Sequence, residues 1–338
     1  MAARAALRPR PTTDDPRPTP LRGAARLGTP RSLRGDAWRR FRRNHLAIAG
    51  AAYLVLLVGV AAFAPAIAPQ NPVRTDVKVA GAYRQAAWVE DANPKRTGSW
   101  EYPLGTDSVG RDVLSRLVYG ARVSLLVGFL PAVAILAIGV PIGLVAGYLG
   151  GLVDGLLMRI TDVVYAFPAL LFFIVMQVAL GETRFGGMLN GLVLLLVTLS
   201  VLSWTGIARV VRGATLELKE AEFVLAARSG GAGIGRVIGR HVLPNALAPV
   251  IVAAAFLAPG AIVAEAILGY LGIGIRPDVA LDAPLPSSWG TMIFDGYRAW
   301  QSQAWMLIAP SLAVALTTLA CTFVGDGLRD ALDVREGR

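Results

Sequence analysis

The sequence predicts an all-α integral membrane protein with six transmembrane helices. Of its 338 residues, 54% are hydrophobic and 17% are charged, and the mean hydropathy is +0.54, which is far from a soluble domain. Six windows are apolar over the length of about 20 residues that a helix needs to cross a bilayer. They cover residues 46–68, 123–147, 163–180, 188–208, 246–264 and 304–325. None alternates as barrel strands do, so helices are expected.

Positive charge is concentrated at the amino end of the chain. The first 45 residues hold 12 arginines, three acidic residues and six of the 21 prolines. This composition predicts a disordered cytoplasmic tail over residues 1–35 that is attracted to anionic lipid, and no nucleic-acid partner is expected. The basic and aromatic mix of residues 38–45 favours an interfacial helix, so residues 36–68 are assigned to that helix and the first span.

The remaining boundaries follow from the windows and the loop charges. Residues 69–121 form an extracytoplasmic segment, residues 122–328 a core of five spans, and residues 329–338 a cytoplasmic carboxyl terminus. The basic excess in loop 213–244 places that loop in the cytoplasm. An even number of spans then puts both termini in the cytoplasm. Within the extracytoplasmic segment, a short helix over residues 105–122 is expected, capped by Thr106 or Asp107.

Few residues could carry chemistry. Cys321 is the one cysteine, and His45 and His241 are far apart along the chain, so neither a disulfide within the chain nor a metal site is expected. None of the three lysines follows a glycine, so the chain lacks the Gly-Lys pair of a phosphate-binding loop. We therefore predict neither a catalytic site nor a cofactor bound by this chain.

Three glycines in the second span share one helix face. Gly139, Gly143 and Gly147 recur every four residues, and such a stripe lets another helix approach closely in a membrane. The stripe predicts either packing within the subunit or a helix that lines a moving interface.

The loop over residues 213–244 has the pattern of a short helix followed by a turn. Phe223, Ala226, Ala227 and Gly230 are spaced to share one narrow face, and the glycine pair at 230–231 is expected to end the helix. A second helical turn is expected over residues 236–241, and Pro244 is placed to open the next span. The pattern fits either a docking site for another protein or a plain amphipathic hairpin.

Residues 222–232 (EFVLAARSGGA) and 240–245 (RHVLPN) resemble the "EAA" coupling loop of binding-protein-dependent ABC importer permeases. Other segments are similar to the dipeptide, oligopeptide and nickel branch, and to the "C" member of its permease pair. They are residues 38–50, 104–116 (LGTDSVGRDVLSR) with 119–122, 154–168 and 325–333 (GDGLRDALD). The resemblance implies the type I importer fold (MetI-like).

The resemblance also implies a function. Short peptides are the expected cargo, with nickel complexes, glutathione or another small solute as alternatives on the same scaffold. The implied partners are a paralogous permease, two ATPase subunits that use ATP, an extracytoplasmic solute-binding protein and the lipid bilayer of a bacterial plasma membrane. The residues expected to seat the loop on an ATPase are Glu222, Ala226, Ala227, Gly231, His241 and Pro244.

Glu265 lies in the fifth apolar segment, which can extend from its window at residues 246–264 on to residue 275, and a carboxylate there is costly. It is either a pathway or gate residue that favours a peptide amino group, or a structural hydrogen-bonding group. Three features depart from the family pattern: Leu225 replaces the usual glutamate, and residues 77–100 and 278–285 look particular to this chain. An ATP-independent secondary carrier, which needs matching halves, and a membrane enzyme or scaffold, which needs clustered catalytic groups, are the competing hypotheses.

Overall fold

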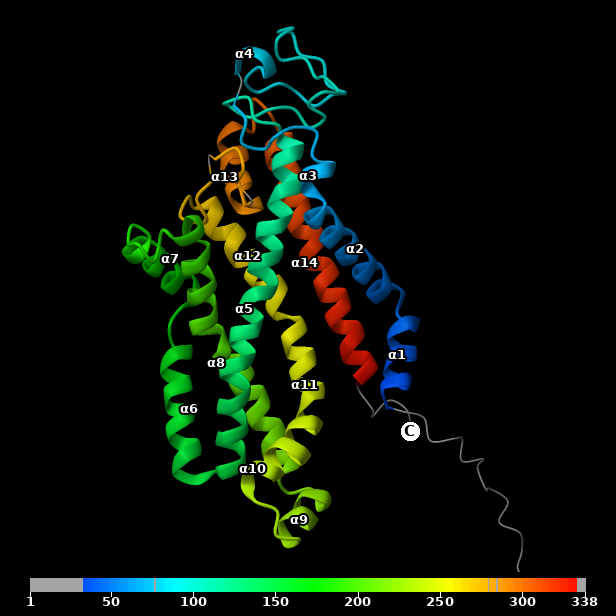
Figure 1. Cartoon of the computed structure of the whole chain (residues 1–338), viewed down its shortest axis with the longest axis vertical. Helices are drawn as coiled ribbons and strands as arrows, with labels where there is room; N and C mark the ends of the chain where they lie inside the picture. The colour runs from blue at the N-terminus through cyan, green and yellow to red at the C-terminus, as the bar shows by residue number, and fades with distance from the viewer. Residues whose placement is uncertain (1–32, 76, 279, 284, 333–338) are drawn as a thin grey trace, which may run out of the picture.

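The computed structural model describes residues 33–75, 77–278, 280–283 and 285–332, and these form a bundle of long helices (Figure 1). Five helical stretches among the described residues are long and apolar enough to cross a membrane: His45–Ala62, Val113–Leu149, Met188–Leu218, Ile234–Tyr270 and Trp305–Leu332. The bent pair Gly151–Tyr165 and Ala169–Leu180 makes six if it counts as a single span. Most of the predicted tail lies outside the described residues. The expected helix before the first span is present, and it begins at Leu33, inside the range assigned to the tail.

The described helices are, in chain order, α1 (Leu33–Arg43), α2 (His45–Ala62), α3 (Ala64–Ile67), α4 (Val77–Ala80), α5 (Val113–Leu149), α6 (Gly151–Tyr165), α7 (Ala169–Leu180), the 3-10 turn η1 (Met188–Gly191), α8 (Leu192–Leu218), α9 (Glu222–Ser229), α10 (Ile234–Val237), the π-turn η2 (Ile238–Val242), α11 (Leu243–Ala255), α12 (Leu257–Tyr270), α13 (Trp289–Ala299) and α14 (Trp305–Leu332).

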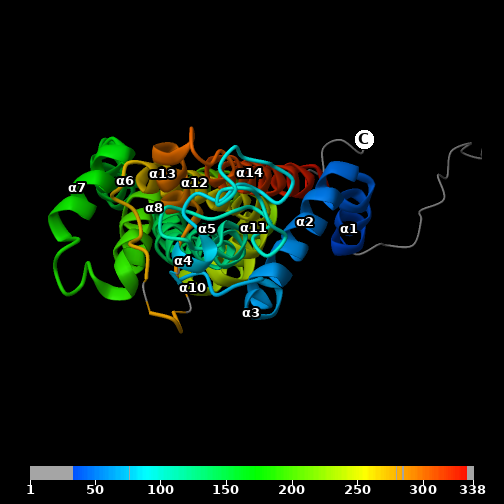
Figure 2. The same ribbon diagram turned by 90° about the horizontal axis from the view of Figure 1, so that it is seen from above.

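The bundle has two different ends. Helices α3, α4 and α13 lie at one end, which we call the α4 end, and α9 and α10 lie at the other, the α9 end (Figure 1). Helix α1 and the last turns of α14 also point toward the α9 end. Viewed along the bundle, α6 and α7 form one edge, α1 and α2 form the other, and α5, α8 and α11 lie between them (Figure 2). Helix α8 is the central element, since 67% of its apolar window is buried, against 22% in α2 and α14.

The third predicted window, residues 163–180, is not one straight helix. Helix α6 starts earlier, at Gly151, and the path bends by 73° before α7. Pro168 explains the break, because it has no N–H to donate and disfavours helical backbone at Phe167. The sequence pattern shows apolarity across the bend but not the change of direction.

The prediction of a short, separate helix over residues 105–122 is wrong. Helix α5 begins at Val113 and continues unbroken into the second span. Its cap is neither Thr106 nor Asp107 but Asp112, whose carboxylate accepts a hydrogen bond from the Ser115 N–H at 2.7 Å. Helix α13 is the opposite case, since no helix was expected in the loop that contains it; the Ser288 and Thr291 side chains form its capping box.

The glycine stripe of α5 lies directly on α8. A Cβ atom at Gly139 or Gly143 would lie 2.7 or 2.5 Å from a backbone oxygen of α8, and one at Gly147 would lie 2.7 Å from the Thr215 Cβ. No side chain therefore fits between the two backbones at these positions, and this close approach is the main contact of the bundle. Gly151, four residues further on, starts α6, and an added Cβ there meets no described atom within 4 Å.

A second close approach joins the two ends of the chain's described part. A Cβ at Gly327 in α14 would collide with the Ala47 side chain of α2 and would lie 3.2 Å from the Phe41 ring of α1. The Asn44 side chain between α1 and α2 donates to the Asp330 carboxylate at 3.4 Å. The glycine-rich motif at residues 325–333 thus brings α14 against the α1–α2 junction.

Four charged side chains tie α5 to α13 at the α4 end. The Arg116 guanidinium donates to the carboxylates of Asp107 and Asp295, each at 2.8 Å, and Arg111 also donates to Asp107 at 2.6 Å. Arg116 is 2% exposed and Asp107 is 1% exposed. Because these charges are removed from water, each depends on its partner for compensation.

We predict that Gly143→Leu destabilises the protein, because its side chain would have to displace the α8 backbone at Ala208. Overpacking of this kind costs about 1–3 kcal/mol. Thermal unfolding of the purified protein in detergent should show a lower midpoint. Gly213→Leu is the matched control, since Gly213 lies on α8 and no atom of the described residues lies within 4 Å of a Cβ added there. Equal midpoints for the two variants would contradict the packing argument.

We predict that Arg116→Met also lowers the unfolding midpoint, because Asp107 and Asp295 would lose their shared partner. Breaking a buried ion pair in this way costs about 3–5 kcal/mol, and Arg111 should keep the loss near the lower value. Arg298→Met serves as the control, since Arg298 is an exposed arginine of α13. A midpoint for Arg116→Met at or above that of the control would show that the ion pairs add no stability.

Candidate functional site

Helix α9 projects at one end of the bundle and ends in a well-formed Schellman turn (Figure 1). The Ala232 N–H donates to the Ala227 carbonyl at 3.1 Å, and the Gly231 N–H donates to the Arg228 carbonyl at 2.9 Å. Gly231 has φ +79°, a left-handed conformation that glycine adopts at no steric cost. The predicted helix and its glycine stop are confirmed, and Gly231 is the residue whose backbone makes the turn.

One side of α9 is anchored to the bundle. Val224 is completely buried in an apolar cluster with Tyr148, Val211, Val237 and Val242. The Arg228 Nε donates to the Tyr148 hydroxyl at 3.0 Å, and its guanidinium lies 4.6 Å from the centre of the same ring. Since Tyr148 is in the last turn of α5, α9 is attached to the helix that packs most closely on α8.

The other side of α9 is open. Glu222, Phe223, Leu225 and Ala226 are exposed, and Ala227 is half-buried. The face of small residues expected from the sequence therefore points away from the bundle within the part of the chain that the structure describes. An exposed helix with apolar and small side chains at its centre has the shape of a surface that seats in a groove of another protein.

Pro244 lies in the first turn of α11, as expected, although the helical path does not begin there. The helical path already starts at Ile234 and runs through the π-turn η2 before reaching α11. In η2 the Leu243 N–H donates to the Ile238 carbonyl, five residues back, and the Asn245 side-chain amide donates to the His241 carbonyl at 2.6 Å. The wider turn accommodates the missing N–H of Pro244 inside a continuous helix.

Two acidic residues of α6 have partners on α8 that the sequence pattern did not reveal. The Asp154 carboxylate accepts two hydrogen bonds from Arg212, each at 2.6 Å. Asp162 accepts one from Arg209 at 2.7 Å, and the Arg209 guanidinium also lies 4.1 Å from the centre of the Tyr165 ring. These pairs fix α6 against α8 ahead of the bend at Pro168. Both acids lie in residues 154–168, one of the segments similar to the permease family, but that similarity did not indicate their partners.

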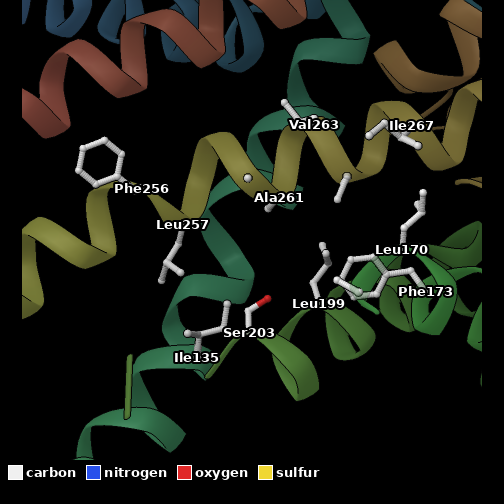
Figure 3. Close-up of a pocket in the computed structure, with 13 residues that line it drawn as sticks. Ile135, Leu170, Phe173, Leu199, Ser203, Phe256, Leu257, Ala261, Val263 and Ile267 are labelled. Carbon is white, nitrogen blue, oxygen red and sulfur yellow. The ribbon is translucent and has the colours of Figure 1, made fainter. Parts of the chain in front are cut away.

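An apolar cavity of about 370 Å³ lies between α5, α7, α8 and α12 (Figure 3). Phe256 and Leu257 line it at the break between α11 and α12, and Ala169 and Leu170 line it just after the α6–α7 bend. Ser203 supplies the polar side chain seen there. A second cavity of about 480 Å³ adjoins it and includes Tyr165 and Pro168. Interrupted helices beside a cavity are the usual form of irregular backbone at membrane depth.

Glu265 does not line either cavity. Its neighbours Ala264 and Ile267 do, whereas Glu265 is completely buried on the side of α12 that faces α13. The nearest polar groups are the Ser288 hydroxyl and the Gly290 N–H at the start of α13, and neither carboxylate oxygen makes a well-formed hydrogen bond to a described residue. A gate role for Glu265 stays a prediction, since its side chain is packed against α13 and does not reach either cavity.

Burial raises the pKa of the Asp112 carboxyl above its usual range, although Ser115 donates to it. No cluster of three or more His, Cys, Asp or Glu side chains within the described ranges could share a metal ion.

Comparison with known sequences identifies a family. Residues 139–338 match the family described as binding-protein-dependent transport system inner membrane component. Residues 32–85 match the N-terminal TM domain of oligopeptide transport permease C.

The curated relatives are similar over most of the chain. The dipeptide transport system permease protein DppC of Bacillus subtilis (strain 168) is 40% identical over 299 residues, which is 88% of this chain and 84% of the relative. The oligopeptide transport system permease protein OppC of Escherichia coli (strain K12) is 36% identical over 90% of this chain and 92% of its own length. The glutathione transport system permease protein GsiD of Pectobacterium atrosepticum is 35% identical over 88% and 90%.

A solved structure has the same fold. An inward-facing conformation of the MetNI methionine ABC transporter includes a chain that matches 64% of this chain and 96% of its own length. The TM-score is 0.50 and the sequences are 21% identical.

Proposed function

The chain belongs to the family of binding-protein-dependent transport system inner membrane components, and from this membership we propose that it is the permease subunit of an ABC importer for short peptides. The observation that carries the proposal is the similarity to dipeptide and oligopeptide permeases, at 36–40% identity along nearly nine-tenths of the chain. A glutathione permease is also similar, at 35%. Peptides are favoured because the dipeptide and oligopeptide permeases of Bacillus subtilis, at 40% and 37% identity, are more similar than the glutathione permease.

In this proposal α9 is the coupling helix. Glu222 and Ala226 on its exposed side would contact an ATPase subunit, with Ala227 and Gly231 keeping the surface low enough to seat in a groove. His241 and Pro244, in the π-turn region, would orient the helix that carries the motion back into the bundle. Leu225, in place of the family's glutamate, would offer an apolar contact there, and Glu222 the nearby acidic group.

The attachments of α9 give a route for the motion. A displacement of α9 moves Val224, which is locked in the apolar cluster around Tyr148 and Val211. The bond from Arg228 to Tyr148 links the same displacement to α5. Because α5 and α8 pack backbone against backbone, they would move together, and the strain would reach the cavity where the other helices are interrupted.

The same proposal gives the assembly and its orientation. The α9 end would face the cytoplasm, where separate ATPases supply the energy, and this chain would bind no nucleotide itself. The α4 end would face outward and receive cargo from a solute-binding protein. A second, paralogous permease would complete the pathway in the bacterial plasma membrane.

The proposal predicts that a second permease and two ATPase subunits co-purify with the chain when it is extracted gently from its native membrane, as identified by mass spectrometry.

Peptide uptake by the same cells should collapse when the partner ATPase carries a disabling substitution in its phosphate-binding loop, because this chain has no other energy source in the proposal. Uptake that continues without ATP hydrolysis would instead support a secondary carrier.

Gly231→Leu is predicted to abolish uptake and substrate-stimulated ATP hydrolysis while the protein still inserts and folds. The bulky residue is strained at φ +79° and so disrupts the turn that ends α9. Gly231→Asn is the matched control, since asparagine tolerates the left-handed conformation better and should retain a large part of the activity. Normal uptake by Gly231→Leu, at equal amounts in the membrane, would exclude α9 as the coupling element.

A further inference from the structure

A second kind of pocket lies near the α4 end, where the end of α7 and the loop into α8 meet the segment after α12. We call it the α7–α12 pocket, and its wall is formed by residues 177, 178, 181, 182, 186, 191, 272–274 and 276. Its volume is about 300 Å³, at the lower limit for pockets that hold small organic ligands. Unlike the apolar cavity at the helix breaks, this pocket carries two opposite charges.

The two charges belong to Glu182 and Arg276, which form an ion pair at the pocket wall. An Arg276 guanidinium nitrogen lies 2.5 Å from a Glu182 carboxylate oxygen. The Glu182 side chain is 86% exposed and the Arg276 side chain is 52% exposed. A pair between two exposed side chains contributes little to stability, so a ligand that offers each of them a new partner can separate them easily.

Gln177 adds a hydrogen-bond donor deeper in the same pocket. It is 8% exposed, and its side-chain nitrogen has no hydrogen-bond partner among the described residues. A buried donor without a partner is unfavourable, so a ligand carbonyl at this position would relieve a cost that the empty pocket carries.

The rest of the wall has almost no side chains. Five of the lining residues are glycines: Gly181, Gly186, Gly191, Gly272 and Gly274. The loop between α7 and α8 is also held in an unusual conformation, with left-handed backbone at Leu189, Asn190 and Gly191. The Arg276 N–H donates to the Asn190 carbonyl at 2.8 Å, which holds this loop against the segment after α12. Such strain is found where a precise surface is needed.

We propose that the α7–α12 pocket is a subsite that holds a short zwitterionic peptide by both ends, with Glu182 binding the ammonium group and Arg276 binding the carboxylate. Gln177 donates to a peptide carbonyl between them. A dipeptide spans about 7 Å when extended, so the two long side chains move apart by several ångströms to admit it. The glycine wall leaves room for different peptide side chains, which suits a transporter that accepts peptides of many sequences. The inference rests on the proposed function and adds the place where cargo is held outside the apolar cavity.

The experiment uses the assembled transporter in lipid nanodiscs and measures binding of three ligands by saturation-transfer NMR: dialanine, N-acetyl-dialanine and dialanine amide. In the wild-type complex, removing either charged end should weaken binding about tenfold, as expected for the loss of one charge-assisted contact. Glu182→Gln should weaken dialanine by a similar factor, and N-acetylation should then have little further effect. Arg276→Gln should also weaken dialanine binding by a similar factor, and amidation should then have little further effect.

Arg184→Gln is the matched control, because Arg184 is exposed in the same loop and lies outside the pocket wall. It should bind all three ligands as the wild type does. The proposal is overturned if the wild-type complex shows no dialanine signal, or if acetylation still weakens binding tenfold in Glu182→Gln. The proposal is also overturned if both variants lose uptake while ligand binding does not depend on ligand charge. The ion pair would then only hold the two segments together.

ATP-dependent uptake by the wild-type complex in proteoliposomes tests the proposed function separately. If that uptake is present and the NMR relation is absent, the subsite alone is wrong. If uptake does not depend on ATP, the proposed function fails, whatever the ligands do.

Discussion

The close approach of α5 and α8 is the constraint on which the rest of the structure depends. Gly139, Gly143 and Gly147 present no side chains to α8, so the two backbones come into direct contact at three positions four residues apart. In a membrane, where burying apolar surface against lipid or protein makes little difference, such packing is a main source of helix association. It places α8 at the centre and makes α5 and α8 one rigid unit.

The attachments at the two ends of the bundle depend on that unit. At one end, Arg116 near the start of α5 joins Asp107 to Asp295 of α13. At the other end, Tyr148 in the last turn of α5 receives Arg228, while Arg212 of α8 holds Asp154 of α6. Polar contacts thus occur mainly near the ends, where water or headgroups lower the cost of charge. Between them the contacts are apolar and the helices are interrupted, so this is the part of the bundle that can repack most easily.

The candidate functional features divide in the same way. The exposed side of α9 and the charged α7–α12 pocket lie toward opposite ends of the bundle, and the apolar cavities beside Phe256 and Pro168 lie between them. A transporter that is driven by ATPases at one end and receives its cargo at the other needs this separation. The rigid α5–α8 unit connects α9 to the middle of the bundle, because Val224 is buried in the cluster that contains Tyr148 and Val211.

The sequence by itself determined the fold class, the six apolar windows, the helix and glycine turn at Glu222–Gly231 and the family, because hydropathy, glycine position and short motifs are local properties of the chain. Only the tertiary structure decided that Asp112 starts α5, that Pro168 turns the third window by 73°, and that Glu265 faces α13 instead of a cavity. It also decided the pairs of Asp154 with Arg212 and of Glu182 with Arg276. These partners lie 58 and 94 residues apart, and their meeting depends on how the helices pack.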